Sequence, residues 1–190
     1  MQRCSYHFAI HSGEVSFPGG RVDESDASFT QAALRETDEE LGLKPSAIEV
    51  LGYIGPPEFE MRGKMRVWPI IGFVHASGCD PNLDEDAVLP SLDMDAVRSQ
   101  ASKDEVGTAF HLPLSSLISP ARLKPTLFRG GKPYWSIDVT DIIQKYLDVE
   151  LDPNSGSVDE VGPGVGGKVE VWGLTGWYLS MLMKRLRVYE

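Results

Sequence analysis

The stretch that decides the fold runs from Gly19 to Leu43 and reads GGRVDESDASFTQAALRETDEELGL. Ser28, followed three residues later by Gln31, is typical of a capped helix start, and Gly42 is typical of a helix end. The sequence therefore predicts a helix from Ser28 to Leu41 that follows a tight Gly-Gly turn.

Acidic residues gather on one face of this predicted helix. At about 100° per residue, Glu36 and Glu40 lie one turn apart, with Glu39 beside them. Three carboxylates this close repel one another, and a hard cation such as Mg²⁺, which prefers oxygen ligands, relieves that repulsion. Arg35 can hold Glu39 by a bidentate contact. The alternative is a solvated acidic face, which is the commoner meaning of such a run.

The Gly-Gly turn lets the backbone approach the acidic face closely, so the Gly20 carbonyl is a candidate additional metal ligand. The alternative for Gly19 and Gly20 is an ordinary hairpin turn.

Together these features resemble the Nudix box, in which Gly, five residues, Glu and seven residues precede Arg-Glu-U-x-Glu-Glu-x-Gly-U, with U an aliphatic residue. The matching residues are Gly20, Arg35, Glu36, Glu39, Glu40, Gly42 and Leu43. Asp26 replaces the first Glu and is separated from Arg35 by eight residues rather than seven, and Thr37 occupies an aliphatic position.

The extra residue resembles a variant found in one Nudix subgroup, the coenzyme A diphosphatases. That subgroup also carries a block like GEVSFPGG, here Gly13 to Gly20, and a Trp-Gly-Leu-Thr segment, here Trp172 to Thr175. It has an Arg four residues before the block, where this chain has Ala9, so we expect either a shortened first strand or a true start further upstream.

The resemblance implies an α/β fold, a Nudix-type α/β/α sandwich with a mixed β-sheet and a loop-helix-loop metal site. It implies Mg²⁺ or Mn²⁺ as cofactor, with Glu36 and Glu40 as the main ligands. Glu39 would be a third ligand or an orienting carboxylate, and Gly20 would complete the shell. Catalysis would be in-line attack of an activated water on a diphosphate phosphorus, with Arg35 and Glu39 in the catalytic group.

A general base is expected on a loop outside the box. Glu105 lies just before a predicted strand, where Nudix enzymes often place such a residue, although a solvent-facing loop acid is an equal alternative.

Substrate-binding residues are expected in two places. Arg62, Lys64 and Arg66 alternate, so one strand would put all three on one face, where they could meet the 3′-phosphate of coenzyme A. The alternative is a solvated sheet face. The resemblance adds the block that leads into the box, with Gly13, Glu14, Phe17 and Gly19.

Three functions compete. The first is hydrolysis of coenzyme A, or its acyl or oxidised derivatives, to adenosine 3′,5′-bisphosphate and 4′-phosphopantetheine or its acyl form. The second is a nucleotide-cleaning hydrolase that acts on oxidised nucleoside triphosphates, ADP-ribose or dinucleotides. The third is a Nudix-fold binding module that has lost turnover.

The composition argues against nucleic-acid and membrane partners and leaves a small molecule as the expected partner. With 28 acidic against 18 basic residues and a net charge of −10, a nucleic-acid partner is not expected. The chain contains no run of 18 apolar residues, so no membrane helix is predicted. The two cysteines give neither a disulfide framework nor a zinc site.

We expect an intracellular location; the resemblance implies a peroxisome or mitochondrion, although no targeting signal is seen. The oligomeric state stays open.

We expect one domain over residues 1–190 with surface-loop insertions at about 78–102, including a short helix at 94–101, and 152–167. Strands are predicted at 6–10, 48–54, 64–75, 109–114, 122–129 and 134–139. Helical segments are predicted at 114–118, 141–147 and 173–186. An apolar stripe on the last of these should pack in the core: Leu174, Trp177, Tyr178, Met181 and Leu182.

Overall fold

The structure is a computed structural model that describes residues 5–11, 14–60, 63–76, 88–146 and 168–189; for residues 5–11 and 14 only the backbone is described. Helices and strands intermix along the chain, as the α/β class predicts. In chain order they are β1 (Ser5–His11), β2 (Glu14–Ser16), α1 (Phe29–Leu41), a 3₁₀ turn (Pro45–Ala47), β3 (Ile48–Tyr53), β4 (Glu58–Phe59), β5 (Arg66–Val67), β6 (Ile70–Val74), α2 (Met94–Gln100), β7 (Ala109–Pro113), α3 (Leu114–Leu117), β8 (Leu123–Phe128), β9 (Lys132–Asp138), α4 (Thr140–Ile143), β10 (Glu170–Val171) and α5 (Gly173–Arg185).

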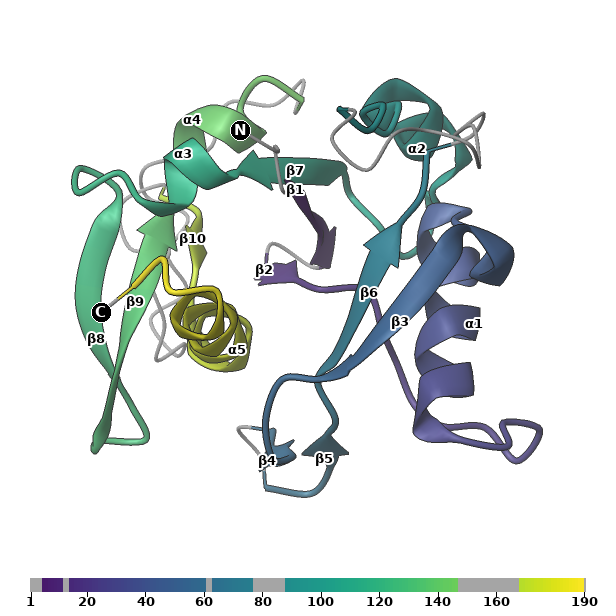
Figure 1. The fold of residues 1–190 in the computed structure, drawn as a ribbon, viewed down its shortest axis with the longest axis horizontal. Coiled ribbons are helices and arrows are strands. Elements are labelled where there is room, and N and C mark those ends of the chain that lie inside the picture. Colours follow the sequence, from purple (N-terminus) through teal and green to yellow (C-terminus); the bar gives the residue numbers. More distant parts are fainter. Residues whose placement is uncertain (1–4, 12–13, 61–62, 77–87, 147–167, 190) are drawn as a thin grey trace.

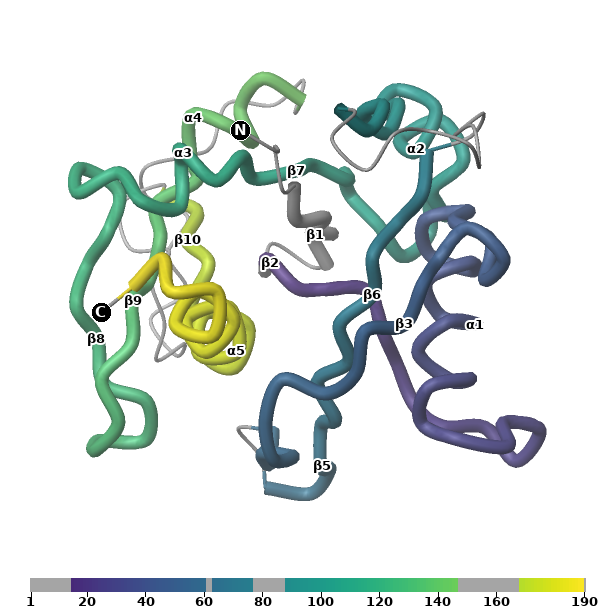
Figure 2. Tube along the Cα trace, in the orientation of Figure 1, coloured from purple at the N-terminus to yellow at the C-terminus, as the bar shows by residue number. Residues whose placement is uncertain are grey.

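These elements form two groups joined by a small central sheet (Figure 1). One group holds the β3–β6 pair with α1 and α2, and the other holds β8, β9 and β10 with α5. The central sheet has the order β2-β1-β7. Every strand pair in the described ranges is antiparallel, so the parallel pairs of a mixed sheet are not seen in that part of the chain. The backbone trace shows β2 leading directly toward α1 (Figure 2).

Helix α1 forms where its end signals predict. The Ser28 hydroxyl accepts the Gln31 N–H at 3.1 Å, while the Gln31 side chain accepts the Ala27 N–H at 2.8 Å. This arrangement resembles a capping box whose second bond is shifted by one residue. At the other end, Gly42 is left-handed with φ 69° and donates its N–H to the Asp38 carbonyl.

The predicted strand at residues 64–75 is wrong in extent. The structure splits it into β5 and β6, and these pair with β4 and β3 respectively. The break falls at Pro69, which has no N–H for a strand ladder and restricts the residue before it. Lys64 lies in the turn rather than in the strand, because Gly63 adopts φ 69° and bonds back to the Glu60 carbonyl.

Two buried clusters form the core, and β7 contributes to both. Phe110 and Leu112 pack with residues of β9, β10 and α5, whereas Ala109 packs with Leu41 of α1 and Val97 of α2. Burial of each large apolar side chain contributes about 1.5–3 kcal/mol. The central strand therefore ties the group of α1 to the group of α5.

Helix α5 packs on β9, with a buried face shifted from the predicted stripe. Tyr178 and Leu182 are buried as expected, but Leu179 and Met183 are the fully buried members, and Trp177 is only half-buried. Trp177 stacks on Phe128 with ring centroids 5.0 Å apart.

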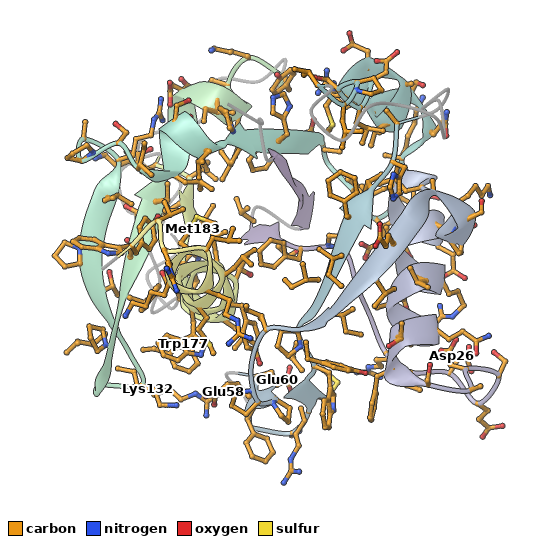
Figure 3. All side chains as sticks on the ribbon, viewed as in Figure 1. Asp26, Glu58, Glu60, Lys132, Trp177 and Met183 are labelled. Carbon is orange, nitrogen blue, oxygen red and sulfur yellow. The ribbon has the colours of Figure 1, made fainter. Side chains whose placement is uncertain are left out.

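The β4–β5 hairpin is fastened to the group of α5 by polar contacts. The Tyr178 hydroxyl accepts the Glu58 N–H at 2.9 Å and donates to the Val67 carbonyl at 3.0 Å. Lys132 forms an ion pair with Glu58 at 3.0 Å, and both lie near Trp177 in the side-chain view (Figure 3).

The remaining elements match the predicted order, with some exceptions. The helix expected within the first insertion is present as α2, and its Met94 and Val97 are buried rather than surface residues. Residues 78–87 and 152–167 lie outside the described residues. Four short elements are not anticipated by the sequence pattern: β2, the 3₁₀ turn, β4 and β10. In the part of the chain that the structure describes, no helix is long and apolar enough to cross a membrane.

Candidate functional site

The loop between β2 and α1 folds back onto the acidic face of the helix. The Gly19 N–H donates to Glu40 Oε2 at 3.2 Å, although the two residues are 21 positions apart. Glu40 is only 5% exposed. A charged group is costly to bury unless it has a hydrogen-bond partner, and the Gly19 N–H is such a partner for Glu40. Glu40 is therefore not part of a solvated acidic face.

Gly20 lies against the Glu36 carboxylate. A Cβ atom at Gly20 would come within 2.4 Å of Glu36 Cδ and Oε1, closer than any real contact of that kind. Only glycine leaves room for this approach, so the Gly-Gly turn serves the acidic face and is not simply a hairpin turn.

Arg35 is the hub of the site. Its Nε and Nη2 donate to the two Asp26 oxygens at 3.2 and 3.0 Å, and its Nη1 donates to Glu39 Oε2 at 2.9 Å. Its Nη2 also lies 3.0 Å from Glu36 Oε1 and donates to the Arg21 carbonyl. The bidentate contact expected with Glu39 is therefore wrong, because the guanidinium fork faces Asp26 instead.

In the sequence, Asp26 stands out only as a departure from the Nudix box. In the structure it binds Arg35 and so holds the loop before α1 to the helix (Figure 3). Its side chain is 2% exposed. The hydrogen bonds from Arg35 and from the Asp23 backbone lower the pKa of Asp26, and the bond with Asp26 raises the pKa of Arg35. Both groups stay charged at neutral pH, so the loop is held to the helix by an ion pair.

The donor set fits a hard divalent cation in its chemistry. Glu36, Glu39 and Glu40 supply carboxylate oxygens from consecutive turns, and the Gly20 backbone lies against one of them. Across the described ranges, no three His, Cys, Asp or Glu side chains converge on one point to hold an ion. The carboxylates are turned instead toward Arg35 and the Gly19 N–H.

Glu105 is exposed in the turn between α2 and β7. This turn is joined to the end of α1, because the Ser102 N–H donates to the Glu40 carbonyl at 2.9 Å. A cavity of about 300 Å³ borders the turn, lined in part by Arg98, Lys103 and Val106. None of the contacts described for this region joins the Glu105 side chain to the α1 glutamates.

The expected substrate-binding residues are only partly brought together. Gly13 and Arg62 lie outside the described residues, as does the side chain of Glu14. Phe17 is half-buried and packs against the core cluster that includes Phe110.

Of the basic residues predicted on one face of the hairpin, the structure describes Lys64 and Arg66. Lys64 is exposed in the turn, and the Arg66 guanidinium lies over the Phe59 ring at 5.0 Å. The single strand that would place these residues on one face is therefore wrong at Lys64, because β5 begins only at Arg66; Arg62 lies outside the described residues.

The chain resembles known proteins over the region that contains this site. The model of the NUDIX domain matches residues 1–106. Proteins named "Uncharacterized Nudix hydrolase NudL" from Shigella boydii serotype 4 (strain Sb227) and Escherichia coli O1:K1 / APEC are 38% and 37% identical over 132 residues. Each alignment covers 69% of this chain and 58% of the relative, so the chain spans less than two thirds of the length of these relatives.

The matched residues 1–106 contain the whole of α1, the Gly19–Gly20 turn and Asp26, and they make up more than half of the 190-residue chain. The fold is correspondingly the α/β fold of that domain. A glutamate-bearing helix held against a glycine turn, together with this match, shows that the chain belongs to the Nudix family.

Proposed function

We propose that this chain, as one catalytic domain over residues 1–190, hydrolyses the diphosphate bond of coenzyme A or its acyl or oxidised derivatives. The products are adenosine 3′,5′-bisphosphate and 4′-phosphopantetheine or its acyl form. One observation supports the substrate most: the block Gly13–Gly20, which resembles coenzyme A diphosphatases, ends in the turn whose Gly19 N–H contacts Glu40.

A second segment with the same resemblance lies nearby. Trp172 to Thr175 begins α5 directly after β10, and β10 lies beside β2, which belongs to the block. The Gly173 N–H donates to the Tyr134 hydroxyl at 2.9 Å, which fixes the start of the helix. The two segments, about 150 residues apart in the sequence, are therefore connected through the neighbouring strands β2 and β10.

Glu36 and Glu40, with Glu39 and the Gly20 carbonyl, would hold Mg²⁺ or Mn²⁺. When bound, such an ion lowers the pKa of water and neutralises phosphate charge. The described contacts indicate what the protein itself does. Arg35 holds Glu39 and Glu36 in place, and the Gly19 N–H orients Glu40.

Hydrolysis requires a water molecule to attack phosphorus while a base takes its proton. Glu105 and Glu39 are the two candidates for that base. Glu39 is already fixed by Arg35, whereas Glu105 is free of such a contact in the described structure and would have to reach the site from the turn that bonds to the end of α1. The bond to the leaving phosphate oxygen breaks as the new phosphorus–oxygen bond forms.

The remaining substrate charge needs cations outside α1. Lys64 and Arg66 are exposed on the β4–β5 hairpin and would contact the 3′-phosphate of coenzyme A, with Arg62 beside them in the sequence. The same residues would simply be solvated if the substrate lacked that group.

A substrate panel tests the proposal. Product release should be measured with coenzyme A, 3′-dephospho-coenzyme A, ADP-ribose, NADH and an oxidised nucleoside triphosphate, with and without Mg²⁺ or Mn²⁺. We expect metal-dependent cleavage of coenzyme A at the highest kcat/KM. If one of the other nucleotides is cleaved with a higher kcat/KM, coenzyme A is not the substrate and the nucleotide-cleaning function is favoured. If no compound is cleaved, the chain is a binding module without turnover.

Glu40→Gln should remove most turnover and leave the fold intact. Loss of groups that only support metal ligands commonly costs about 10- to 100-fold, so loss of a ligand charge should cost at least as much. Stability should hold, because the amide oxygen can still accept the Gly19 N–H and one charge leaves an acidic cluster. The measurements are the rate at saturating Mg²⁺ and the melting temperature without metal.

The control for this variant is Glu24→Gln, which changes an exposed acid in the preceding loop. Near-normal turnover of Glu40→Gln would overturn the ligand assignment.

A further inference from the structure

Three aromatic rings stand together at the start of α1. Phe29, the first residue of the helix, stacks on Trp68 with ring centroids 4.7 Å apart and an interplanar angle of 14°. Tyr53, at the end of β3, meets Trp68 edge-on at 6.0 Å. The Tyr53 hydroxyl also lies 3.3 Å from the Thr30 hydroxyl in the first turn of α1. We call Phe29, Tyr53 and Trp68 the aromatic cluster.

The aromatic cluster remains open to solvent. Phe29 is 44% exposed, Tyr53 is 52% exposed and Trp68 is 38% exposed. Aromatic side chains each bury 150–250 Å² in a core or an interface, and contiguous exposed apolar groups commonly mark a binding site. The aromatic cluster therefore leaves part of its ring surface uncovered.

Four other rings have a cation close to them. Arg66 lies over Phe59, Arg98 over Tyr146, Arg129 over Phe128 and Lys132 near Trp177. Among the described side chains, no cation takes such a position over the three rings of the aromatic cluster. Their exposed faces are available to a planar group.

The aromatic cluster continues the acidic face of α1. Phe29 precedes Glu36 by seven residues and Glu40 by eleven, so at 100° per residue it projects between them, about 10 Å toward the helix start from Glu36. The intervening Ala33 is small and only partly buried. A ribose and its attached phosphate bridge such a separation between a nucleobase and a diphosphate bond.

We propose that the aromatic cluster binds the nucleobase of the diphosphate substrate, an inference that rests on the proposed function. The base extends the existing Phe29–Trp68 stack or lies on Tyr53, and the Thr30 and Tyr53 hydroxyls offer hydrogen bonds to its edge. A planar base uses both the ring faces and the hydroxyl pair, whereas a flexible acyl or pantetheine chain has no planar ring to stack on the cluster. The diphosphate then points along α1 toward Glu36.

The test compares two uncleavable ligands by calorimetry in the presence of Mg²⁺. Adenosine 5′-(α,β-methylene)diphosphate carries the base, and methylenediphosphonate lacks it. Loss of base stacking typically weakens binding roughly five- to a hundredfold. We expect Phe29→Leu and Tyr53→Leu each to weaken the adenosine ligand in that range and to leave methylenediphosphonate unchanged. Tyr146→Leu, at a comparably exposed ring that lies against Arg98 of α2, should change neither.

The outcomes separate this inference from the proposed function. Weaker binding of the adenosine ligand alone supports the inference even if coenzyme A is not cleaved. Cleavage of coenzyme A with unchanged KM in both variants overturns the inference and leaves the proposed function standing. Equal losses for both ligands also overturn it. If light scattering shows that the variants dissociate an oligomer while ligand affinity holds, the aromatic cluster is a contact between copies and the inference fails.

Discussion

At the scale of single residues, Gly20 matters because it has no Cβ atom, which would collide with the Glu36 carboxylate. Its position against Glu36 follows from the loop that Asp26 and Arg35 fasten to the helix. Its backbone is not in the left-handed region, so alanine is acceptable to the chain, and only the Glu36 carboxylate stands in the way. The position therefore separates the geometry of the site from the stability of the fold.

Gly20→Ala should displace Glu36 while keeping the fold. The added Cβ would meet the end of a flexible side chain, so the melting temperature should barely change. Misplacement of a reacting group by about 1 Å can cost up to a hundredfold in rate, so we expect a clear loss of turnover and a higher Mg²⁺ concentration at half-maximal rate. Gly131→Ala is the matched control, because nothing lies within 4 Å of its added Cβ. An unchanged Mg²⁺ dependence would show that Glu36 is not needed.

At the scale of elements, the end of α1 also determines how α2 packs. Gly42 closes the helix in the left-handed region, and its missing Cβ faces Gln100 of α2 at 2.8 Å from the Gln100 Cβ. Gly63 has the same φ of 69° but has nothing within 4 Å of its added Cβ. The two glycines therefore differ in packing and not in backbone strain.

Gly42→Ala should destabilise the protein more than Gly63→Ala does. The left-handed conformation costs a residue with a Cβ about 1–2 kcal/mol, and this applies to both variants. Overpacking adds about 1–3 kcal/mol, and this applies only to Gly42. Urea unfolding of the two variants and the parent provides the comparison. Equal losses would mean that α2 moves away from α1 without cost.

At the scale of the whole molecule, both β7 and the β4–β5 hairpin join the group of α1 to the group of α5. The strand β7 contributes side chains to both buried clusters. The Tyr178 hydroxyl of α5 bonds to β4 and β5, and the hairpin that contains them continues directly from β3 and into β6. Burial raises the pKa of Tyr178, so this hydroxyl stays protonated and remains a donor at neutral pH.

Tyr178→Phe should weaken this connection. It removes the hydrogen bonds to the part-buried Glu58 N–H and Val67 carbonyl, and the loss of a typical hydrogen bond costs about 0.5–1.5 kcal/mol. We expect a lower free energy of unfolding and faster hydrogen exchange at the Glu58 amide. Tyr146→Phe, at a ring on the surface, should stay within about 0.5 kcal/mol of the parent. If the two variants are equally stable, the hairpin is held by its ion pair and ring contacts instead.

Local signals in the sequence were enough to predict most of the secondary structure. Helix α1 begins and ends where Ser28, Gln31 and Gly42 predict, because caps act through hydrogen bonds between residues a few positions apart. The strands β3, β7, β8 and β9 were also predicted by their apolar patterns. Short elements such as β4 and β10 carry too few residues for a pattern, and they form only because β5 and β9 are there to pair with them.

The sequence by itself determined the Nudix resemblance and the single face shared by Glu36 and Glu40, because helix periodicity depends only on spacing along the chain. The tertiary structure alone decided which partners those charges have. Arg35 turns its fork to Asp26 rather than Glu39, Gly19 reaches Glu40, and Phe29 stacks on Trp68. Each of these contacts depends on where a loop or a distant strand comes to lie beside α1, and that placement is set by packing of the whole chain rather than by local spacing.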